Sequence, residues 1–516
     1  MVLFMAVFYF VVLVALQAVA SQDAAVKEIF LPRRSNLPFL ESEHIENSTK
    51  AKISITHDKI FSVVSKRFLS FAIHAKAFAR RSPFLYHDAT FLTLCKGLSM
   101  QKGTDSNIYL RAAGNAANKI YFRKDSHRLD DNHHDKFFMN PLRWDNLMSF
   151  VSKLGWKLLF GLNGLPRKAD GSWDYSNPLE FLQYARSRGD DVDYELGNEP
   201  DLYKEHNISL SASQVARDFE LLHTLASDVM PNSKIIGPDI SHIPNNTYFL
   251  SFLKEIKPDA IDAVSWHFYY KEGSNITLSD YTNPKFLDSF LRISKEAINM
   301  IKSANGTRIC PVWIGETADG WGGGAAGLSD SYAAGFTYLD KLGLGAVLNI
   351  NVVVRQAIIG ANYALLDRNN NFFPRPCYWL SSLYKLFFGE RVLEVNGSTD
   401  YNREVRVYAH CINEDGRHSY EKGSIVLLVI NLHATNKAII ELDAKIRSLP
   451  VHQYLLEPSQ DDLTSRYVKL NDRLLELVDN TTMPSYEPRV VKQPFLVPPV
   501  RYGFFVIPSA GFEACL

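Results

Sequence analysis

The sequence predicts an α/β fold in which a (β/α)8 TIM barrel is followed by a C-terminal antiparallel β-sandwich domain. Two regions of the chain with different patterns of apolar and polar residues support this prediction. Over residues 66–388, short β-rich runs alternate with longer amphipathic segments in eight strand-then-helix units, the order typical of a (β/α)8 barrel. Over residues 390–516, apolar and polar residues alternate in short runs separated by turns, which indicates an antiparallel sandwich. A chain of 516 residues is long enough for both units.

Each predicted barrel strand is a short β-rich run that a helical segment follows. The strands are expected at Phe68–His74, Ile108–Arg111, Lys157–Leu162, Val192–Leu196, Lys234–Pro238, Ala263–Tyr269, Val312–Gly315 and Ala346–Val354. The helices are expected near residues 83–98, 141–154, 176–187, 211–229, 246–256, 284–302, 329–342 and 376–388. A doubly wound open sheet is the competing fold. No GxGxxG or GxxxxGK(S/T) loop follows any strand, so the nucleotide sites usual in such sheets lack support.

The predicted sandwich draws on both ends of the chain. Its own strands include Val405–Ala409, Ser424–Asn431 and Phe504–Ile507. Residues 51–62, which precede the barrel, are expected to contribute one more strand to it. Residues 21–50 are polar and interrupted by proline, and we expect them to form an N-terminal extension.

The first twenty residues have the character of a targeting segment. Residues 1–20 are almost wholly apolar and end in Ala18-Val19-Ala20, a small-x-small cleavage pattern. They are predicted to be a signal peptide, and an uncleaved membrane anchor is the alternative. No later stretch is long and apolar enough to span a bilayer. The chain is therefore expected to be secreted and extracellular, with the lysosome as a second destination.

The charge balance excludes one class of partner. Lys plus Arg and Asp plus Glu both number 56, so no overall field favours nucleic acid or another polyanion. No nucleic-acid partner is expected, and recognition of an acidic substrate would have to be local.

Sequons and cysteines fit an extracellular chain. Cys411 and Cys515 both lie in the C-terminal part and could pair, which would leave Cys95, Cys310 and Cys377 as buried or free thiols. No CxxC or clustered Cys/His pattern indicates a metal, and we expect no cofactor. Seven Asn-x-Ser/Thr sequons are candidate glycosylation sites on surface loops. They begin at Asn47, Asn207, Asn245, Asn275, Asn305, Asn396 and Asn480.

Two glutamates stand at the C-terminal ends of predicted strands, where the chemistry of a (β/α)8 barrel is found. Glu199 follows the fourth strand in an Asn-Glu-Pro sequence, and Glu316 follows the seventh in a Gly-Glu-Thr sequence. Strands four and seven face each other across the barrel mouth, so the two side chains can converge. Retaining glycoside hydrolysis needs two carboxyl groups about 5–5.5 Å apart, one protonated and one ionised. The pair therefore predicts a retaining glycoside hydrolase with Glu199 as acid/base and Glu316 as nucleophile.

Neighbouring residues support these roles. Asn198 could bind the sugar 2-hydroxyl, and ionised Glu316 favours a protonated Glu199 by like-charge repulsion. His267 and Tyr269 share one face of the sixth strand, from which Tyr269 could orient Glu316 by a hydrogen bond. Taken alone, Asn-Glu-Pro is also the start of a capped helix. Glu195 is interpreted as a structural carboxylate that would share a face with Glu199 in a regular strand.

These motifs resemble those of the animal heparanases. The likeness runs from about residue 51 to the C-terminus, with the motifs in order at matching strand ends. It rests on Glu195–Pro200, Ala263–Tyr270, Trp313–Ala325, Tyr338–Leu344, Arg355-Gln356 and Asn362-Tyr363. The resemblance implies a (β/α)8 barrel with a β-sandwich, an endo-β-glucuronidase activity on heparan sulfate, and a Cys411–Cys515 disulfide.

The resemblance also implies residue roles. By motif, Glu199 corresponds to the proton donor of the family and Glu316 to its nucleophile. Gly322 and Gly323 correspond to glycines that contact the glucuronate carboxylate, and Tyr363 to a tyrosine at the same place. Consecutive glycines let backbone N–H groups approach an anion closely, although a merely flexible loop is the alternative. The substrate-binding residues are therefore predicted to include Asn198, His267, Tyr269, Trp321, Gly322, Gly323, Tyr363 and Lys76.

The chain departs from the family where sulfate groups would bind. The Asp-Ala-Asn of the first strand is here His74-Ala75-Lys76. The two basic clusters of the family correspond to residues 136–140 and 242–247, and an arginine after the sixth strand to Ser274. Each missing cation removes a charge-assisted bond to sulfate or carboxylate. Lys76 and Arg111 are expected to serve the remaining subsites.

The expected function is a retaining endo-β-glucuronidase that cleaves glucuronosyl linkages in heparan sulfate-type glycosaminoglycans by double displacement. The alternatives are an exo-β-glucuronidase of small or poorly sulfated glucuronides and a non-catalytic heparan-sulfate-binding protein. Membrane contact is expected only through cell-surface proteoglycans, and the chain is expected to be a monomer. Since residues 125–135 form only a short polar stretch, activity without proteolytic excision is expected.

Overall fold

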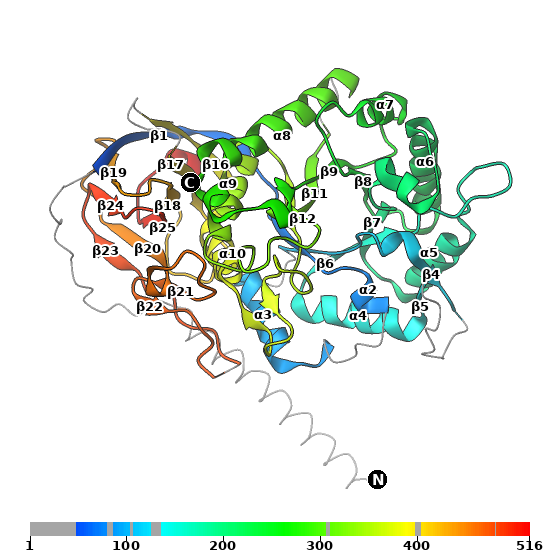
Figure 1. Cartoon of the computed structure of the whole chain (residues 1–516), viewed down its shortest axis with the longest axis horizontal. Helices are drawn as coiled ribbons and strands as arrows, with labels where there is room; N and C mark the ends of the chain where they lie inside the picture. The colour runs from blue at the N-terminus through cyan, green and yellow to red at the C-terminus, as the bar shows by residue number, and fades with distance from the viewer. Residues whose placement is uncertain are drawn as a thin grey trace, which may run out of the picture.

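The computed structural model describes residues 48–79, 86–103, 107–124, 136–305, 310–397, 404–479 and 481–516. The predicted signal peptide at 1–20 and nearly all of the predicted extension at 21–50 lie outside these residues, as does the 125–135 stretch. A barrel ringed by helices stands beside a unit built mainly of strands (Figure 1). No helix in the described ranges is long and apolar enough to cross a membrane.

The barrel strands are parallel and close in the order β11-β13-β2-β3-β6-β7-β8-β9. The eight strands are β2 (Leu69–Ala72), β3 (Tyr109–Ala112), β6 (Lys157–Leu162), β7 (Val192–Leu196), β8 (Ile235–Ile240), β9 (Ala263–Phe268), β11 (Val312–Thr317) and β13 (Val352–Arg355). Each one overlaps a predicted strand, and the predicted (β/α)8 barrel is confirmed. In chain order, β7 is the fourth barrel strand and β11 the seventh.

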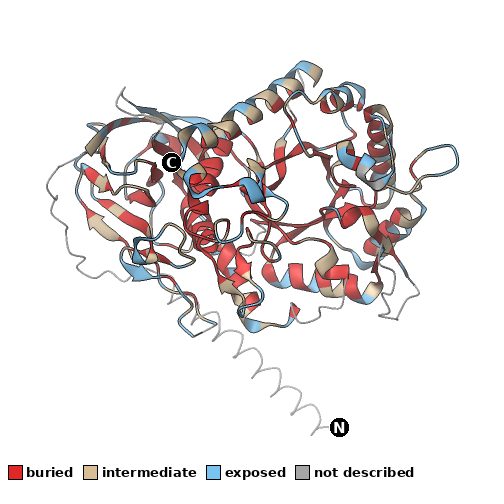
Figure 2. Cartoon of the chain, viewed as in Figure 1, coloured by how far each residue is buried: buried red, intermediate tan, exposed pale blue. Residues whose placement is uncertain are grey.

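Helices cover the outside of the barrel. They are α2 (Lys76–Ala79), α3 (Ala89–Ser99), α4 (Pro141–Leu154), α5 (Ser176–Arg188), α6 (Ala212–Val229), α7 (Thr247–Glu255), α8 (Pro284–Asn305), α9 (Ala334–Val347) and α10 (Pro376–Phe387). The barrel strands are buried on both faces, while helices such as α8 expose one side (Figure 2). Burial on both faces explains why these strands appear in the sequence as nearly continuous apolar runs.

Local sequence signals set the helix ends. At α4, the Asn140 side chain accepts a hydrogen bond from the Arg143 amide, and Pro141 occupies the first turn. The same helix ends at Gly155, whose φ of 64° is the left-handed conformation that glycine favours. These signals explain why the predicted span 141–154 matches α4.

The last barrel strand is shorter than predicted. The expected strand Ala346–Val354 begins inside α9, which continues to Val347, and β13 starts only at Val352. Asn349, with a φ of 56°, makes the turn between helix and strand. A continuous apolar run does not by itself distinguish a buried helix from a buried strand, and this run contains the end of one and the start of the other.

The second unit is an eleven-stranded sheet in which most neighbours are antiparallel. Its strands are β1 (Ser48–Val63), β16 (Phe388–Gly397), β17 (Val405–Ile412), β18 (Ile425–Asn431), β19 (Lys437–Leu442), β20 (Val451–Pro458), β21 (Val468–Leu470), β22 (Arg473–Leu474), β23 (Arg489–Val491), β24 (Phe495–Val497) and β25 (Arg501–Ile507). The path is continuous, and β24 at its end lies against β18 and β25, so the sheet curls over an apolar core. β1 pairs antiparallel with β16 and parallel with β19, and it begins ahead of the predicted start at residue 51.

Short strand pairs complete the fold. They are β4 (Ile120–Phe122) with β5 (Phe137–Met139), β10 (Lys271–Glu272) with β12 (Gly320–Trp321), and β14 (Leu366–Asp367) with β15 (Phe373–Pro374). The pair β10–β12 joins the loops that follow β9 and β11, at the end of the barrel where the two predicted catalytic glutamates stand.

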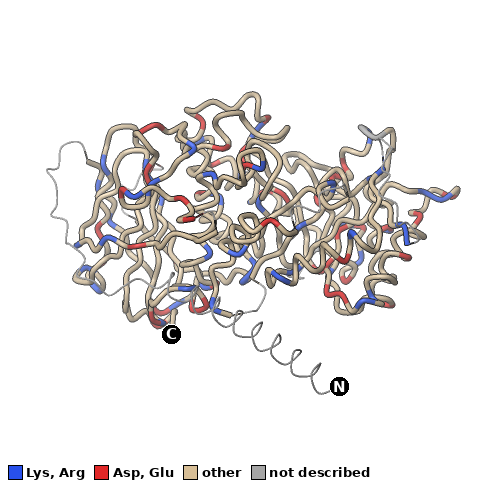
Figure 3. Tube along the Cα trace, turned by 90° about the horizontal axis from the view of Figure 1, so that it is seen from below, with Lys and Arg blue, Asp and Glu red and all other residues tan. Residues whose placement is uncertain are grey.

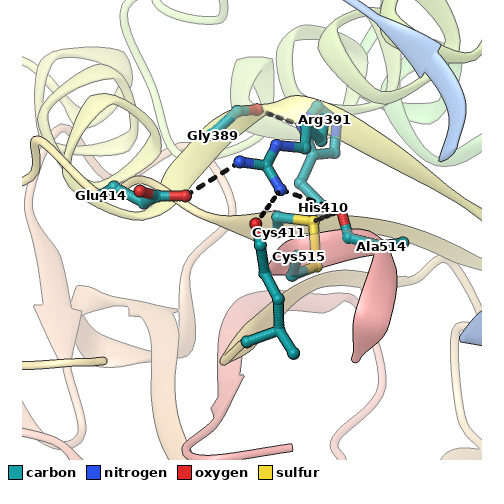
Figure 4. Close-up of a disulfide and its surroundings, with 8 residues drawn as sticks. Gly389, Arg391, His410, Cys411, Glu414, Ala514 and Cys515 are labelled. Carbon is teal, nitrogen blue, oxygen red and sulfur yellow. Dashed lines mark hydrogen bonds and ion pairs between the residues drawn. A yellow bond between two sulfur atoms is a disulfide. The ribbon is translucent and has the colours of Figure 1, made fainter. Parts of the chain in front are cut away.

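A disulfide closes the C-terminus onto the sheet. Cys411 on β17 is bonded to Cys515, the pair that the family resemblance implies, with Cα atoms 5.3 Å apart. Arg391 lies beside it and donates to the carbonyl oxygens of Ala514 and Leu516 and to the Glu414 carboxylate (Figure 4). The three cysteines outside the disulfide, Cys95, Cys310 and Cys377, are all buried.

The barrel and the sheet share one interface built around α9. This helix is buried along almost its whole length. Its Asp340 accepts hydrogen bonds from Arg406 at 3.3 Å and from the Tyr408 hydroxyl at 2.6 Å, both on β17. Tyr332, just before the helix, stacks on Tyr502 of β25 with ring centroids 4.4 Å apart. The sheet therefore supports the segment that leads out of the β11 loop.

Candidate active site

Glu316 lies near the end of β11 and is held through both carboxylate oxygens. Arg111 on β3 donates to Oε2 at 2.8 Å, and the Tyr269 hydroxyl donates to Oε1 at 2.6 Å, which is the bond expected for Tyr269. Burial acts to raise the pKa of Glu316, but the charges of His267 and Arg111 and the bond from Tyr269 outweigh it. The pKa of Glu316 therefore lies below its ordinary value, and the side chain is ionised at neutral pH.

Arg111 organises the floor of the site. Its guanidinium is fully buried and donates from Nε to both oxygens of Glu195 at 2.9 Å. Its Nη2 reaches Asn198 Oδ1 at 3.1 Å and Asp239 Oδ2 at 3.3 Å. All of its donor nitrogens are therefore engaged within the barrel. The expectation that Arg111 serves a sugar subsite is wrong, because its role is to pair with the carboxylates of neighbouring strands.

Glu199 approaches the site from an irregular turn. β7 ends at Leu196, and Gly197 (φ 72°) and Glu199 (φ 52°) then adopt left-handed backbone conformations. The strand does not stay regular as far as Glu199, so Glu195 and Glu199 are separated by this turn and do not share a face. Glu195 points into the floor, and the Glu199 side chain is 18% exposed at the mouth.

His267 connects the two halves of the site. Its Nδ1 lies 2.8 Å from Glu199 Oε1, and its Nε2 lies 3.6 Å from Asp239 Oδ1. Burial acts to lower the pKa of His267, but Glu316, Asp239 and Glu199 together raise it to about 10. His267 is therefore an imidazolium that donates to Glu199 from below, rather than a side chain open to a ligand. The other oxygen of Glu199 has no partner among the described residues.

The loop after β3 fixes the amide of Asn198. Asn198 accepts from Arg111 through Oδ1 and donates from Nδ2 to Asn115 Oδ1 at 2.8 Å. Asn118 donates to the Asn198 carbonyl oxygen at 3.0 Å. These bonds orient the side-chain amide of Asn198. One hydrogen of Nδ2 has no acceptor among the described residues, which is compatible with the predicted contact to a sugar hydroxyl.

A glycine-rich loop follows β11 on one side of the mouth. Gly322 (φ 73°) and Gly323 (φ 93°) form its tip in a conformation that only glycine adopts readily. Trp321 precedes the tip and is 50% exposed. Tyr363 lies against this loop, and the centroid of its ring is 6.4 Å from the ring centroid of Tyr269. The structure thus brings the predicted loop residues and Tyr363 to the same wall as Glu316.

Lys76 lies against an aromatic ring. The residue is half-buried, and its Nζ stands over the Phe137 ring at 5.6 Å from the centroid. His74 lies close to Glu316, and neither of its ring nitrogens has a hydrogen-bond partner within the described part of the chain. Burial lowers the pKa of His74 despite the charge of Glu316, so its imidazole is neutral.

Sequence reasoning missed three members of this site: Arg111, expected at a subsite, and Asp239 and Asn118, for which no role is expected. Glu195 is the structural carboxylate that the sequence predicts, since it is buried and paired with Arg111. Asp239 lies within β8, directly after the cis-proline Pro238, and its burial among charged partners becomes visible only once the barrel has closed. Arg111 is the one feature of the sequence from which this network could be predicted, because an arginine in an otherwise apolar buried strand needs carboxylate partners.

The predicted sequons that the structure describes are on the surface. The exposed ones are Asn207, Asn245, Asn275 and Asn396. Asn47, Asn480 and the side chain of Asn305 lie outside the described part.

A closed (β/α)8 barrel with paired glutamates at the ends of its fourth and seventh strands defines a glycoside hydrolase. The solved structures agree on the fold: a 4-O-α-L-rhamnosyl-β-D-glucuronidase from Fusarium oxysporum superposes with a TM-score of 0.66 at 14% identity, covering 88% of this chain and 100% of that one.

Sequence comparisons identify the family. Residues 104–343 match glycosyl hydrolase family 79, N-terminal domain. The heparanase of Bos taurus is 39% identical over 381 residues, which cover 72% of this chain and 68% of the bovine protein. The hyaluronoglucuronidase of Hirudo nipponia is 29% identical over 504 residues, covering 90% of this chain and 99% of that protein. The chain belongs to the heparanase family of glycosyl hydrolases, family 79, and is a glucuronidase-type glycosidase.

Proposed function

We propose that this protein is a retaining endo-β-glucuronidase that cleaves glucuronosyl linkages within a glycosaminoglycan by double displacement. One observation carries the proposal: a single buried network orients both glutamates at the mouth of the barrel. Arg111 and Tyr269 stabilise Glu316 as a carboxylate, and His267 orients Glu199 while leaving its second oxygen free.

In the first step, the carboxylate of Glu316 attacks the anomeric carbon of the glucuronosyl unit. The glycosidic C–O bond breaks, and the leaving oxygen takes a proton from Glu199. Having given up its proton, Glu199 is now a carboxylate that can act as a base. In the second step, Glu199 accepts a proton from water, whose oxygen attacks the same carbon and releases Glu316.

The wall opposite Glu199 is suited to a uronate. Gly322 and Gly323 place backbone N–H groups at an open loop tip, and the buried Tyr363 adds a hydroxyl whose pKa is raised by burial. A carboxylate at C5 of the sugar would accept hydrogen bonds from these groups. The exposed Trp321 offers an apolar ring face beside them, and Asn198 is placed to meet the 2-hydroxyl.

A heparan sulfate-type chain is the polymer that the heparanase relatives suggest, but a second candidate has its own support. The replaced basic clusters and Ser274 supply few cations for sulfate, and the sequons at Asn245 and Asn275 are exposed beside them. Basic and acidic residues are scattered along the whole trace (Figure 3). An unsulfated glucuronate polymer, as the name of the leech relative suggests, or a small glucuronide cut in exo fashion fits these features.

The remaining expectations form part of the same proposal. The chain would act as a secreted, glycosylated monomer, with lysosomal delivery as the alternative, and would meet membranes only through proteoglycans. It would need no excision of residues 125–135 before acting.

The test is digestion by the unprocessed full-length chain of three substrates: size-defined heparan sulfate, size-defined hyaluronan and an aryl β-glucuronide. Shortening of either polymer supports endo action and identifies the preferred chain. Release from the aryl glucuronide alone would indicate an exo-enzyme. If all three survive while the protein binds a heparin column firmly, the non-catalytic alternative replaces the proposal.

A further inference from the structure

A buried carboxylate outside the catalytic network lies directly behind the glycine-rich loop. Asp319 follows the end of β11 and is 4% exposed. Its Oδ1 accepts from the Gly320 amide at 3.0 Å. Its Oδ2 accepts from the hydroxyls of Tyr281 at 2.5 Å and Ser329 at 2.6 Å. Three donors from three segments therefore converge on a side chain that takes no part in the chemistry described above.

These donors connect the two ends of the loop. Gly320 is its first residue, and Ser329 accepts a hydrogen bond from the amide of Ala325 at the other end, at 2.7 Å. Tyr281 comes from a short 3-10 helix after β10, Leu278–Thr282, and is itself fully buried. A single carboxylate thus ties the start of the loop, its end and the neighbouring segment together.

Close backbone packing completes the base of the loop. A Cβ atom at Gly320 would lie 2.8 Å from Gly273 Cα, and one at Gly273 would lie 2.4 Å from the carbonyl carbon of Gly324. The tip is different: a Cβ at Gly322 would meet nothing within 4 Å, and one at Gly323 only Ala361 at 3.8 Å. The base is therefore clamped while the tip faces open space.

The clamped base leaves amides free at the tip. The N–H group of Gly323 at the tip, and that of Gly324 where the tip meets the base, have no acceptor among the residues that the structure describes. The backbone amide of Asn362 donates to the carbonyl oxygen of Gly323 at 3.0 Å, and its side-chain Nδ2 donates to that of Gly324 at 3.2 Å. Asn362 thereby holds these two oxygens on the side of the loop opposite the N–H groups. Oriented N–H groups without acceptors form an anion-binding concavity.

We propose that Asp319, acting with Tyr281 and Ser329, is the positioning residue that holds this loop in its anion-receiving form and thereby selects a uronate. This inference rests on the proposed function, because the uronate carboxylate is the anion the loop would receive. Asp319 does not touch the substrate. Its own charge is already satisfied by three donors, so it can stand behind an anion site without competing for the same N–H groups.

The test compares Asp319→Ala with the wild-type full-length chain in two readouts. With an aryl β-glucuronide, KM should rise about tenfold or more, because oriented donors to a carboxylate are lost, while kcat changes much less. Hydrogen exchange in peptides covering residues 320–328 should become faster. A variant with unchanged exchange, or with faster exchange but an unchanged KM, would overturn the proposal.

Milder variants guard against a general folding defect. Tyr281→Phe and Ser329→Ala each remove one donor and should raise KM by a smaller factor. Asp330→Asn is the matched control, because Asp330 is the next acid along the chain and pairs with Arg466 outside the loop. It should leave both readouts at wild-type values, and an equal rise in KM for Asp330→Asn would contradict a specific role for Asp319.

Failure of the proposed function would be visible separately. A wild-type chain that cleaves neither polymer nor the aryl β-glucuronide would refute the proposed activity on its own. Calorimetric titration with D-glucuronate would then replace KM, and tighter binding by wild type than by Asp319→Ala would still support the positioning role. Equal affinity of the two proteins, including no binding by either, would overturn it.

Discussion

The floor of the barrel mouth and its rim satisfy their polar groups in opposite ways. On the floor, Arg111 and its carboxylate partners are buried, and each is bonded to another member of the same network. On the rim, Trp321 is half exposed, and Lys76 rests on an aromatic ring rather than on a carboxylate. Removing a floor residue leaves a buried charge unpaired, whereas a rim residue can change at little cost to the fold.

On the proposed function, this difference explains how the chain can keep both glutamates while it departs from the heparanase motifs at residues 136–140 and 242–247 and at Ser274. The glutamates and the residues that orient them form a closed set, so substitution of one member disturbs the others. The rim positions Lys76 and Ser274 have no such constraint. Substrate preference is therefore expected to vary independently of the catalytic step.

Among substitutions at the floor, Glu316→Gln should cause the largest loss of activity. This change keeps an oxygen acceptor for Arg111 but removes the nucleophile, so kcat on an aryl β-glucuronide should fall by at least about 10³-fold. The melting temperature should stay close to that of wild type. A folded variant with full activity would remove Glu316 from the mechanism.

Arg111→Met should be the most destabilising change at the mouth. It leaves the carboxylates of Glu195 and Asp239 buried without their cation, and the free energy of unfolding should fall by about 3–5 kcal/mol. Urea titration measures the loss, and activity should disappear with it. Arg123→Met provides the rim control: Arg123 is exposed over the Phe138 ring, so stability should change by only about 0.5 kcal/mol. Similar losses for both variants would refute the contrast between floor and rim.

Tyr269→Phe should shift a pH profile more than it shifts stability. The lost hydrogen bond favours the ionised form of Glu316, so the pKa of Glu316 should rise toward its ordinary value. Because the nucleophile must be ionised, the acidic limb of the pH profile of kcat/KM should move to higher pH. The value of kcat should also fall about tenfold, because the hydrogen bond that orients the nucleophile is lost. Tyr121→Phe, on β4, serves as the control and should leave that limb in place. An acidic limb unmoved in Tyr269→Phe would mean that another group sets it.

Lys76→Ala should have the smallest effect. Hydrolysis of an aryl β-glucuronide should stay within about threefold of wild type, because Lys76 stands over the Phe137 ring and is bonded to none of the catalytic carboxylates among the described residues. KM for a polymeric glucuronate substrate should rise by a modest factor if Lys76 meets the chain beyond that sugar. A large loss on the aryl substrate would place Lys76 in the floor rather than on the rim.

Much of the fold could be predicted because barrel strands are short, buried and regularly followed by helices. Glu199 and Glu316 could be found for the same reason, since the ends of the fourth and seventh strands are fixed by that order. The junction of α9 and β13 could not, because one apolar run covers both. The path of β1 could be predicted only in part, since pairing between distant segments leaves little trace in local sequence.

The support of the site was harder to predict than its reactive groups. Arg111, Glu195 and Asp239 meet across three strands, and their contacts depend on the inward register of the closed barrel. The left-handed turn at Gly197 and Glu199 was equally hidden, because Glu199 is not a residue that favours a positive φ. Asp319 appeared only as part of a family motif, although it ties the glycine-rich loop at both ends.

The most direct test of the central claim is the anomeric outcome of hydrolysis, followed by proton NMR as the full-length chain cleaves an aryl β-glucuronide. Double displacement through Glu316 predicts that β-glucuronic acid is released first and reaches its equilibrium with the α-anomer only afterwards. Release of the α-anomer first would show a single inverting displacement and contradict the assignment of Glu316 as nucleophile.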